Sequence, residues 1–137
     1  MKTEEMKSTN GKTGLIEVYI NPPGKANFVP YGLALRASGY GFRSLITRFR
    51  DHDLEDGEAA AMGFLAPNLE IDASALKADS NDSSMVRSAI EAAFQNAAKA
   101  ALSGEYDIVV LDGVLDMVLK DSISLKDILK LMREKAM

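Results

Sequence analysis

The sequence predicts a mixed α/β domain built around a mostly parallel sheet, and three observations lead to this prediction. Residues 106–112 (YDIVVLD) are apolar at consecutive positions in their centre, which is typical of a strand buried on both faces in the middle of a parallel sheet. Residues 84–102 carry apolar side chains at helical spacing along one face, which indicates an amphipathic helix. Strand and helix patterns alternate along the chain, and this order favours a sheet that helices cover through right-handed crossovers.

Shorter patterns complete the series of elements. The helix at residues 84–102 has Asp82 or Ser83 as the candidate cap for its open amides, and it ends at Gly104,. Further strands are expected at residues 14–20, 44–49 and, with a weaker pattern, 69–71, and further helices at residues 31–37 and 124–135. The last helix opens with Ser124 and Asp127 at the spacing of a capping-box variant,.

Length and composition limit the class of protein. The chain has 137 residues, which suits one domain; we assign this domain to residues 13–137 and expect residues 1–12 to form a flexible N-terminal arm,. The net charge of −4 argues against nucleic-acid and membrane-surface partners, which require a basic face,. The chain has no cysteine, no apolar run near the ~18 residues of a membrane span and no signal-like amino terminus, so we expect a cytoplasmic protein,.

Two strand ends stand out as places for a ligand. In an open parallel sheet, ligands bind at the carboxyl ends of the strands. One such end is the loop that follows Ile20, and the other is Asp112 at the end of the most apolar strand. A loop after one strand and an aspartate after a later apolar strand is the layout of a P-loop nucleotide site.

Two blocks of sequence carry a family resemblance on top of this layout. Residues 14–20 (GLIEVYI) are followed by residues 32–49 (GLALRASGYGFRSLITRF), and residues 103–112 (SGEYDIVVLD) are followed by residues 124–132 (SLKDILKLM). In this order the chain, from about residue 13 to its end, resembles the ATP:corrinoid adenosyltransferases of vitamin B12 synthesis and salvage. The resemblance implies a three-layer P-loop NTPase-like (RecA-like) fold, ATP with Mg²⁺ and a corrinoid as ligands, and transfer of the 5′-deoxyadenosyl group of ATP to a Co(I) corrinoid.

The phosphate loop is where the chain departs most from this family, whose loop runs G-x-G-K-G-K-T-T. The ungapped match makes residues 21–28 (NPPGKANF) this loop, and the candidate ATP-binding residues are Asn21, Gly24, Lys25 and Asn27. Pro22 and Pro23 have no N–H to offer a phosphate,. A shift of one residue restores a glycine–lysine pair but places Ala26 where the hydroxyl for Mg²⁺ belongs,. The loop is therefore degenerate in either register, and Lys25 is either an exposed turn lysine or a cation for a different anion,.

Asp112 matches the Mg²⁺-associated aspartate of the family and is the candidate metal ligand. Gly113 stands where a glutamate usually follows, so the aspartate has no adjacent carboxylate. An isolated aspartate at a strand end is alternatively interpreted as a helix cap or a surface charge. Asp116, one helical turn further on, is a possible substitute for the missing carboxylate.

The corrinoid side and the carboxyl terminus also differ from the family pattern. The aromatic-rich segment that contacts the corrin in the family corresponds roughly to Leu76, Lys77 and Ala78. Phe94 stands where a family tryptophan is common, and its place on the apolar helix face predicts a core residue. The chain ends soon after its last helix, so we expect the fold to lack the C-terminal strand(s) of the family and to have a sheet edge that a second subunit covers,.

Two functions of different classes follow from these observations. The first is a non-catalytic relative with impaired ATP binding, which acts by binding a corrinoid or a protein partner, as a homodimer or paired with an intact family member. The second is an active adenosyltransferase with Mg²⁺ at Asp112. We take the first as the working hypothesis because it accounts for a retained fold together with a lost phosphate loop, and a fold does not dictate a function.

Overall fold

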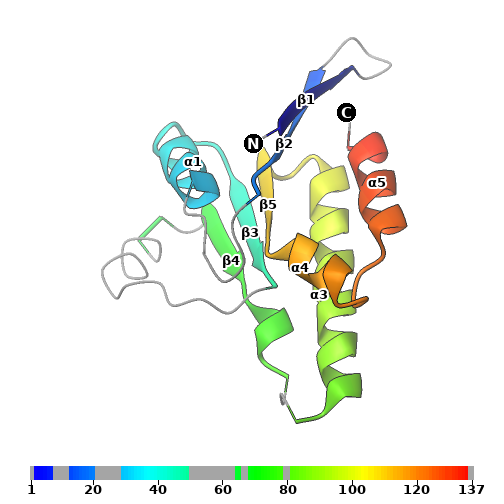
Figure 1. Cartoon of the computed structure of the whole chain (residues 1–137). Helices are drawn as coiled ribbons and strands as arrows, with labels where there is room; N and C mark the ends of the chain where they lie inside the picture. Colours follow the sequence, from blue (N-terminus) through cyan, green and yellow to red (C-terminus); the bar gives the residue numbers. More distant parts are fainter. Residues whose placement is uncertain are drawn as a thin grey trace.

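The computed structural model describes residues 2–7, 13–20, 29–49, 64–65, 68–78 and 81–135, and it confirms the mixed α/β class. Three parallel strands form the central sheet in the order β4-β3-β5 (Figure 1). Their bounds are Ser44–Arg48 for β3, Leu69–Asp72 for β4 and Ile108–Asp112 for β5. The register pairs Thr47 with Asp72 and Arg48 with Asp112, so the three strands end at the same edge of the sheet.

The central strand of this sheet is β3, whereas the sequence predicted β5 for that place. Among the described residues, β5 pairs only with β3, and its residues are half-buried. β3 has a neighbour on each side, and its first four residues are buried. An apolar run reports that helices cover both faces of a strand, but it does not report how many neighbours the strand has. For this reason the run in β5 wrongly indicated the middle of the sheet.

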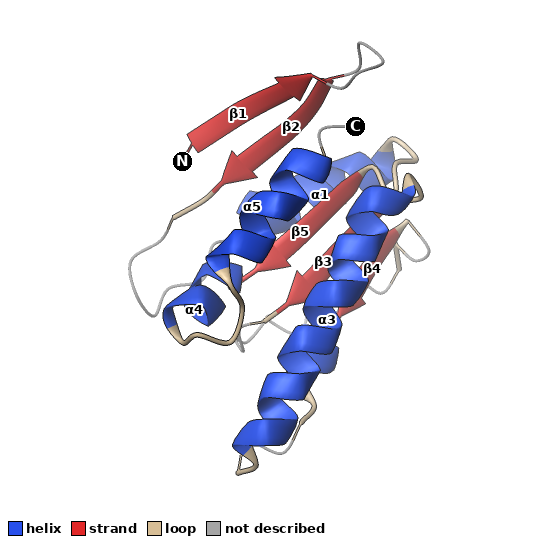
Figure 2. Cartoon of the chain, turned by 90° about the vertical axis from the view of Figure 1, so that its right-hand side faces the viewer, coloured by secondary structure: helices blue, strands red, loops and turns tan. Residues whose placement is uncertain are grey.

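Helices cover both faces of the sheet, which gives the three layers expected for the fold. Figure 2 shows α3, α4 and α5 on one side of the sheet and α1 on the other. A short 3-10 helix, η1, leads from β4 toward α3 and packs against it. The bounds are Val29–Gly39 for α1, Ser74–Leu76 for η1, Ser83–Ser103 for α3, Val114–Leu119 for α4 and Leu125–Glu134 for α5.

Each face of the sheet has its own apolar core. The larger core lies between the sheet and α3, α4 and α5, and Phe94 is buried within it, as predicted. The smaller core joins Tyr31 and Ala34 of α1 to Ile46 of β3 and Leu69 of β4. Because both α1 residues in this cluster are at most 3% exposed, close packing fixes the start of α1 against the strands.

Side chains and glycine set the ends of the long helix α3. The Asp82 carboxylate accepts hydrogen bonds from the N–H groups of Ser84 and Met85 at 3.1 and 3.2 Å, so Asp82 rather than Ser83 is the cap. Gly104 follows the helix with a φ of 79°, a left-handed conformation that favours glycine because it has no Cβ,. The helix therefore begins and ends where its sequence indicates.

A separate hairpin holds the strand that the sequence predicted at residues 14–20. Strand β2 (Thr13–Val18) pairs in antiparallel fashion with β1 (Lys2–Lys7), and the two form a sheet of their own. Part of the expected flexible arm is thus a strand, because a short connection lets a nearby segment pair with β2. The division into an arm at residues 1–12 and a domain at residues 13–137 stays a prediction.

A polar cluster joins the three parallel strands at their amino ends. The Arg43 guanidinium lies 3.0 Å from the Glu70 carboxylate and 4.9 Å from the centre of the Tyr106 ring. The Tyr106 hydroxyl donates to the other oxygen of Glu70 at 2.8 Å. This cluster connects the starts of β3, β4 and β5 at the edge opposite to the one where the strands end.

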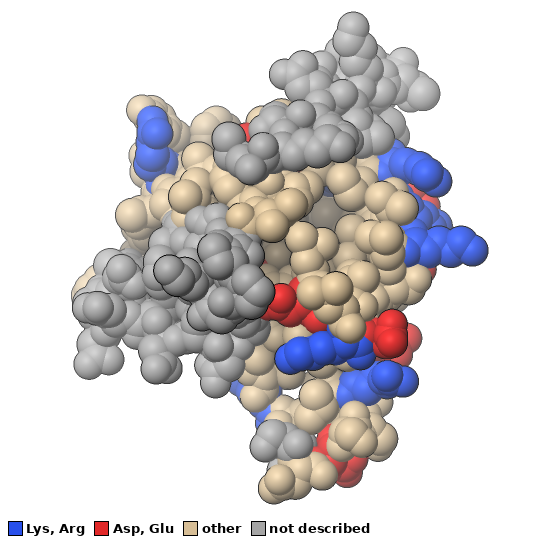
Figure 3. Space-filling view, viewed as in Figure 1, with Lys and Arg blue, Asp and Glu red and all other residues tan. Residues whose placement is uncertain are grey.

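The face of the molecule drawn in Figure 3 carries charged side chains of both signs. Figure 3 shows acidic and basic side chains next to each other at the right and lower parts of that face, with uncharged residues at its centre. Within the described residues, none of the helices combines the length and the apolarity that crossing a bilayer requires.

We predict that Phe94→Ala destabilises the protein by about 3–5 kcal/mol, because it removes a large side chain from the main core and leaves a cavity. Phe94 is 4% exposed, whereas Phe42, just after α1, is 50% exposed and serves as the control. Phe42→Ala is expected to change the free energy of unfolding by about 0.5 kcal/mol or less. Urea denaturation followed by circular dichroism measures both, and equal losses would contradict the assignment of Phe94 to the core.

Candidate functional site

The candidate site lies where β3 and β5 end beneath the first turn of α1. Arg48 is the last residue of β3, Asp112 is the last residue of β5, and the two are register partners. Ile46 and Val110, two residues earlier in each strand, pack in the core under α1. Because side chains alternate along a strand, Arg48 and Asp112 extend on the same face as these residues. A cation and an anion therefore meet at the carboxyl edge of the sheet.

Tyr31 of α1 completes this group. Its hydroxyl donates a hydrogen bond to Oδ2 of Asp112 at an O···O distance of 2.6 Å. The two residues are 81 positions apart in the chain, so the contact ties the start of α1 directly to the end of β5. Only 3% of Tyr31 is exposed, and a hydrogen bond from a buried hydroxyl to a carboxylate belongs to the stronger, charge-assisted class.

The surroundings keep the Tyr31 hydroxyl protonated. Burial raises the pKa of Tyr31 far above its usual value, and the hydrogen bond to Asp112 and the negative charge of Asp112 raise it further. The Arg48 guanidinium, which also hydrogen-bonds to Tyr31, lowers this pKa and offsets part of the rise. Tyr31 is therefore a neutral donor at physiological pH, and it holds a carboxylate that has a fixed positive charge nearby.

The residues after Asp112 supply little for a metal ion. Gly113 turns the chain with a φ of 83°, and α4 begins directly after it, with Asp116 in its first turn. Among the described residues, no three His, Cys, Asp or Glu side chains are grouped so that they could hold a metal ion. Mg²⁺ at a nucleotide site needs one or two carboxylates together with phosphate oxygens. Asp112 accepts a hydrogen bond from Tyr31 and is the register partner of Arg48, and its role as a ligand of Mg²⁺ stays a prediction.

The four residues predicted for the phosphate loop lie outside the described residues. These are Asn21, Gly24, Lys25 and Asn27. The structure brings the first turn of α1, which follows this segment, to the end of β5 through Tyr31. Of the four loop residues and Asp112, it therefore places Asp112 alone.

The segment predicted to correspond to the corrin-contacting region lies around η1. Leu76 is the last residue of η1, and Lys77 follows as its C-cap. Ala75, just before them, is buried in the core shared with α3. Phe94 is also part of that core. This region provides packing between η1 and α3, and its link to a corrinoid stays a prediction.

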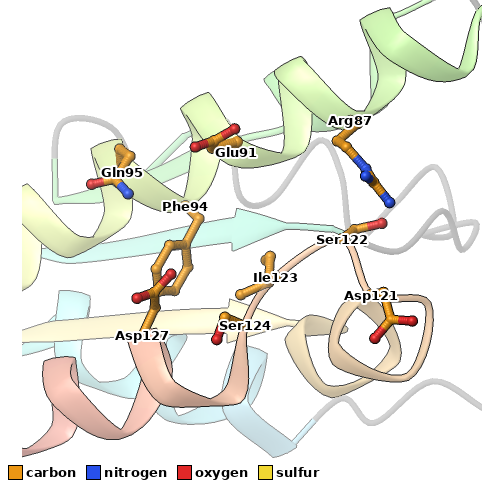
Figure 4. A pocket seen from close by; sticks show the side chains of 9 residues that line it. All are labelled: Arg87, Glu91, Phe94, Gln95, Asp121, Ser122, Ile123, Ser124 and Asp127. Atoms are coloured by element: carbon orange, nitrogen blue, oxygen red, sulfur yellow. The ribbon is translucent and has the colours of Figure 1, made fainter.

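A small hollow opens between α3 and the connection from α4 to α5. It has a volume of about 160 Å³. Figure 4 shows Arg87, Glu91 and Gln95 along α3 on one side, and residues 121–124 and Asp127 on the other. Phe94 and Ile123, which are buried, also line it. The polar lining mixes both charge signs, and the hollow is separate from the group around Asp112.

Sequence reasoning missed two of the three residues in this group. The sequence predicts a helix at Tyr31 and a strand at Arg48, but its pattern points to neither residue as part of a site. One signal was available for Arg48, which is a charged residue at the end of a strand whose preceding residues are buried. Such a residue must extend toward solvent or meet an opposite charge. Tyr31 gives no comparable signal, because its partner is distant in sequence.

The arrangement defines a class of protein. A parallel sheet with helices on both faces, and an aspartate at the carboxyl end of a strand under the first turn of a helix, is the plan of P-loop NTPase-like domains,. The family model for ATP:corrinoid adenosyltransferase BtuR/CobO/CobP matches residues 12–137. The chain belongs to this family. A comparison with curated proteins gives no match.

We predict that Tyr31 makes stability fall as pH rises above about 10, the usual pKa of tyrosine. Below this pH the hydroxyl is protonated in both states. Above it the unfolded chain releases the proton, whereas the raised pKa in the folded protein retains it, so alkali favours unfolding. Tyr31→Phe removes this component and is expected to flatten the decline in melting temperature between pH 10 and 12.

Tyr40→Phe is the matched control, because Tyr40 lies just after α1 and is 78% exposed. It is expected to keep the wild-type dependence on pH. Thermal unfolding at a series of pH values measures all three proteins. An unchanged slope in Tyr31→Phe would contradict the assigned role of the buried hydroxyl.

Proposed function

We propose that the chain is a non-catalytic member of its family, with impaired ATP binding, which acts by binding a corrinoid or a protein partner. The observation that carries this proposal is the hydrogen bond of 2.6 Å from the Tyr31 hydroxyl to Asp112. In the family resemblance, Asp112 is the residue associated with Mg²⁺. In this chain the carboxylate is held by its own protein, next to Arg48.

The sequence of the phosphate loop supports the same conclusion. Pro22 and Pro23 supply no amide hydrogen, and in the ungapped register Ala26 stands at the position of the lysine,. Each charge-assisted hydrogen bond lost to a phosphate is worth about 1.5–3 kcal/mol. The loss of several such bonds lowers the affinity for ATP by several powers of ten, since about 1.4 kcal/mol corresponds to a factor of ten.

The retained scaffold supports a role in binding rather than a loss of all function. The parallel sheet, the helices on both of its faces and their two cores are formed. Selection for the fold alone keeps these features when the catalytic positions change. As partners we propose a second copy of the chain or an intact family member, because β5 has an outer edge that is not paired among the described residues, and such edges are usually covered.

The alternative is an active adenosyltransferase, and one observation favours it. The family model extends over residues 12–137, which includes both the altered loop and Asp112. On this alternative the chain would transfer the 5′-deoxyadenosyl group of ATP to a Co(I) corrinoid, with release of the triphosphate. This requires the loop to bind ATP in spite of its two prolines.

We predict that calorimetric titration of the purified protein with Mg·ATP gives no binding heat up to millimolar nucleotide. An intact ATP:corrinoid adenosyltransferase, titrated in the same buffer, is the positive control. A second assay supplies ATP and a chemically reduced corrinoid and looks for the adenosylated product by its absorption spectrum. Micromolar binding of ATP, or product above the level without protein, would establish the enzyme and remove the non-catalytic proposal.

A further inference from the structure

We propose that Tyr31 closes Asp112 against divalent cations, so that the residue at position 31 decides whether this strand end can hold a metal ion. The inference deepens the proposed function and rests on it, because it names the cause that keeps Mg²⁺ from the site. It concerns only the described group of Tyr31, Arg48 and Asp112 at the junction of α1, β3 and β5. The phosphate loop plays no part in it.

The first step is the geometry of the carboxylate. A metal ion binds a carboxylate through its oxygen lone pairs, at about 2.0–2.1 Å for Mg²⁺. Oδ2 of Asp112 already accepts the Tyr31 hydroxyl at 2.6 Å, on the face of the sheet that α1 covers. An ion that approaches this oxygen from the same side must therefore displace the phenol.

The second step is that Tyr31 cannot easily move away. It is 3% exposed and packs with Ala34, Ile46 and Leu69 in the core under α1. The ring is held by the first turn of α1, which lies on the strands. Withdrawal of the hydroxyl therefore requires movement of the helix start and opening of a close-packed cluster.

The third step is electrostatic. Arg48 extends beside Asp112 from the neighbouring strand and contacts Tyr31 closely enough to hydrogen-bond with it. A divalent cation at Asp112 would be repelled by the positive charge of this guanidinium. The hydroxyl proton and the guanidinium together give the carboxylate the positive surroundings that a metal ion would otherwise supply.

If Tyr31 instead supports metal binding by Asp112, its removal is expected to weaken the affinity for a divalent cation. Carboxylates that bind metals often accept a hydrogen bond from a neighbouring group, which orients them and strengthens metal binding. If Tyr31 acted in this way, its removal would weaken cation binding at Asp112. If it closes the site, its removal strengthens binding. The sign of the change in affinity separates the two roles.

The test uses Mn²⁺ as a paramagnetic substitute for Mg²⁺, without nucleotide. Titration followed by the electron paramagnetic resonance signal of free Mn²⁺ gives the affinity of the wild type, Tyr31→Phe, Tyr40→Phe and the double variant Tyr31→Phe/Asp112→Asn. We expect Tyr31→Phe to bind Mn²⁺ about tenfold or more tightly than the wild type, because the ion no longer displaces a charge-assisted hydrogen bond. The double variant is expected to lose this gain, and Tyr40→Phe to behave as the wild type.

A second variant tests the inference even if Tyr31→Phe does not fold. Arg48→Gln keeps a long polar side chain but removes the positive charge, and it is expected to raise the affinity for Mn²⁺ as well. Circular dichroism confirms that each variant is folded. If Tyr31→Phe is folded and its affinity for Mn²⁺ is unchanged or weaker, the inference is overturned. If Tyr31→Phe does not fold, an unchanged or weaker affinity of Arg48→Gln for Mn²⁺ overturns it.

The two proposals fail in different ways. ATP binding by the wild type would remove the proposed function and leave the Mn²⁺ comparison without nucleotide to decide the role of Tyr31. Failure of Tyr31→Phe to gain Mn²⁺ binding would remove the inference about Tyr31 and leave the calorimetric test of ATP unaffected.

Discussion

The hydrogen bond between Tyr31 and Asp112 is the constraint on which the carboxyl edge of the sheet, the candidate site, depends. It joins the start of α1 to the end of β5, two places that are 81 residues apart in sequence. A carboxylate at a strand end under a helix carries a cost in free energy unless positive or donor groups surround it. Tyr31 and Arg48 supply those groups from the protein itself. On the function proposed here, these groups take the place of a bound cation.

Strand β3 makes this arrangement possible, because it has neighbours along both of its edges and on both faces of the sheet. β4 and β5 pair with its two edges, the small core under α1 lies on one face, and the large core under α3 lies on the other. Arg43, just before β3, belongs to the polar cluster at the amino edge, and Arg48 at its end belongs to the group around Asp112. The two ends of one buried strand thus organise both polar edges of the sheet.

Patterns that are local in sequence predicted most of the elements, and contacts between distant residues account for the rest. Apolar spacing and the Asp82 cap located α3, and the run before Asp112 located β5. The central place of β3 and the pairing of β2 with β1 were not predicted, because strand order depends on which backbones meet and not on the pattern of one strand. Asp112 was found through its place at a strand end. Tyr31 was not found, because an aromatic residue in a helix is usually interpreted as a core residue. The partner of its hydroxyl, Asp112, lies far along the chain.

The same distinction bears on the function proposed here, in which the family fold is kept and its chemistry is lost. The core under α3 holds that helix on one face of the sheet. In the core under α1, Tyr31 packs with its neighbours and is also the residue that reaches Asp112 at the carboxyl edge. At that edge, the free energy of the folded chain depends on Asp112 having positive surroundings, and either a bound cation or the pair Tyr31 and Arg48 meets this need. On the function proposed here, the internal pair has taken this place, so the fold no longer depends on nucleotide or metal. A protein in that state keeps a stable α/β surface for binding, with Tyr31 serving both the core under α1 and the surroundings of Asp112.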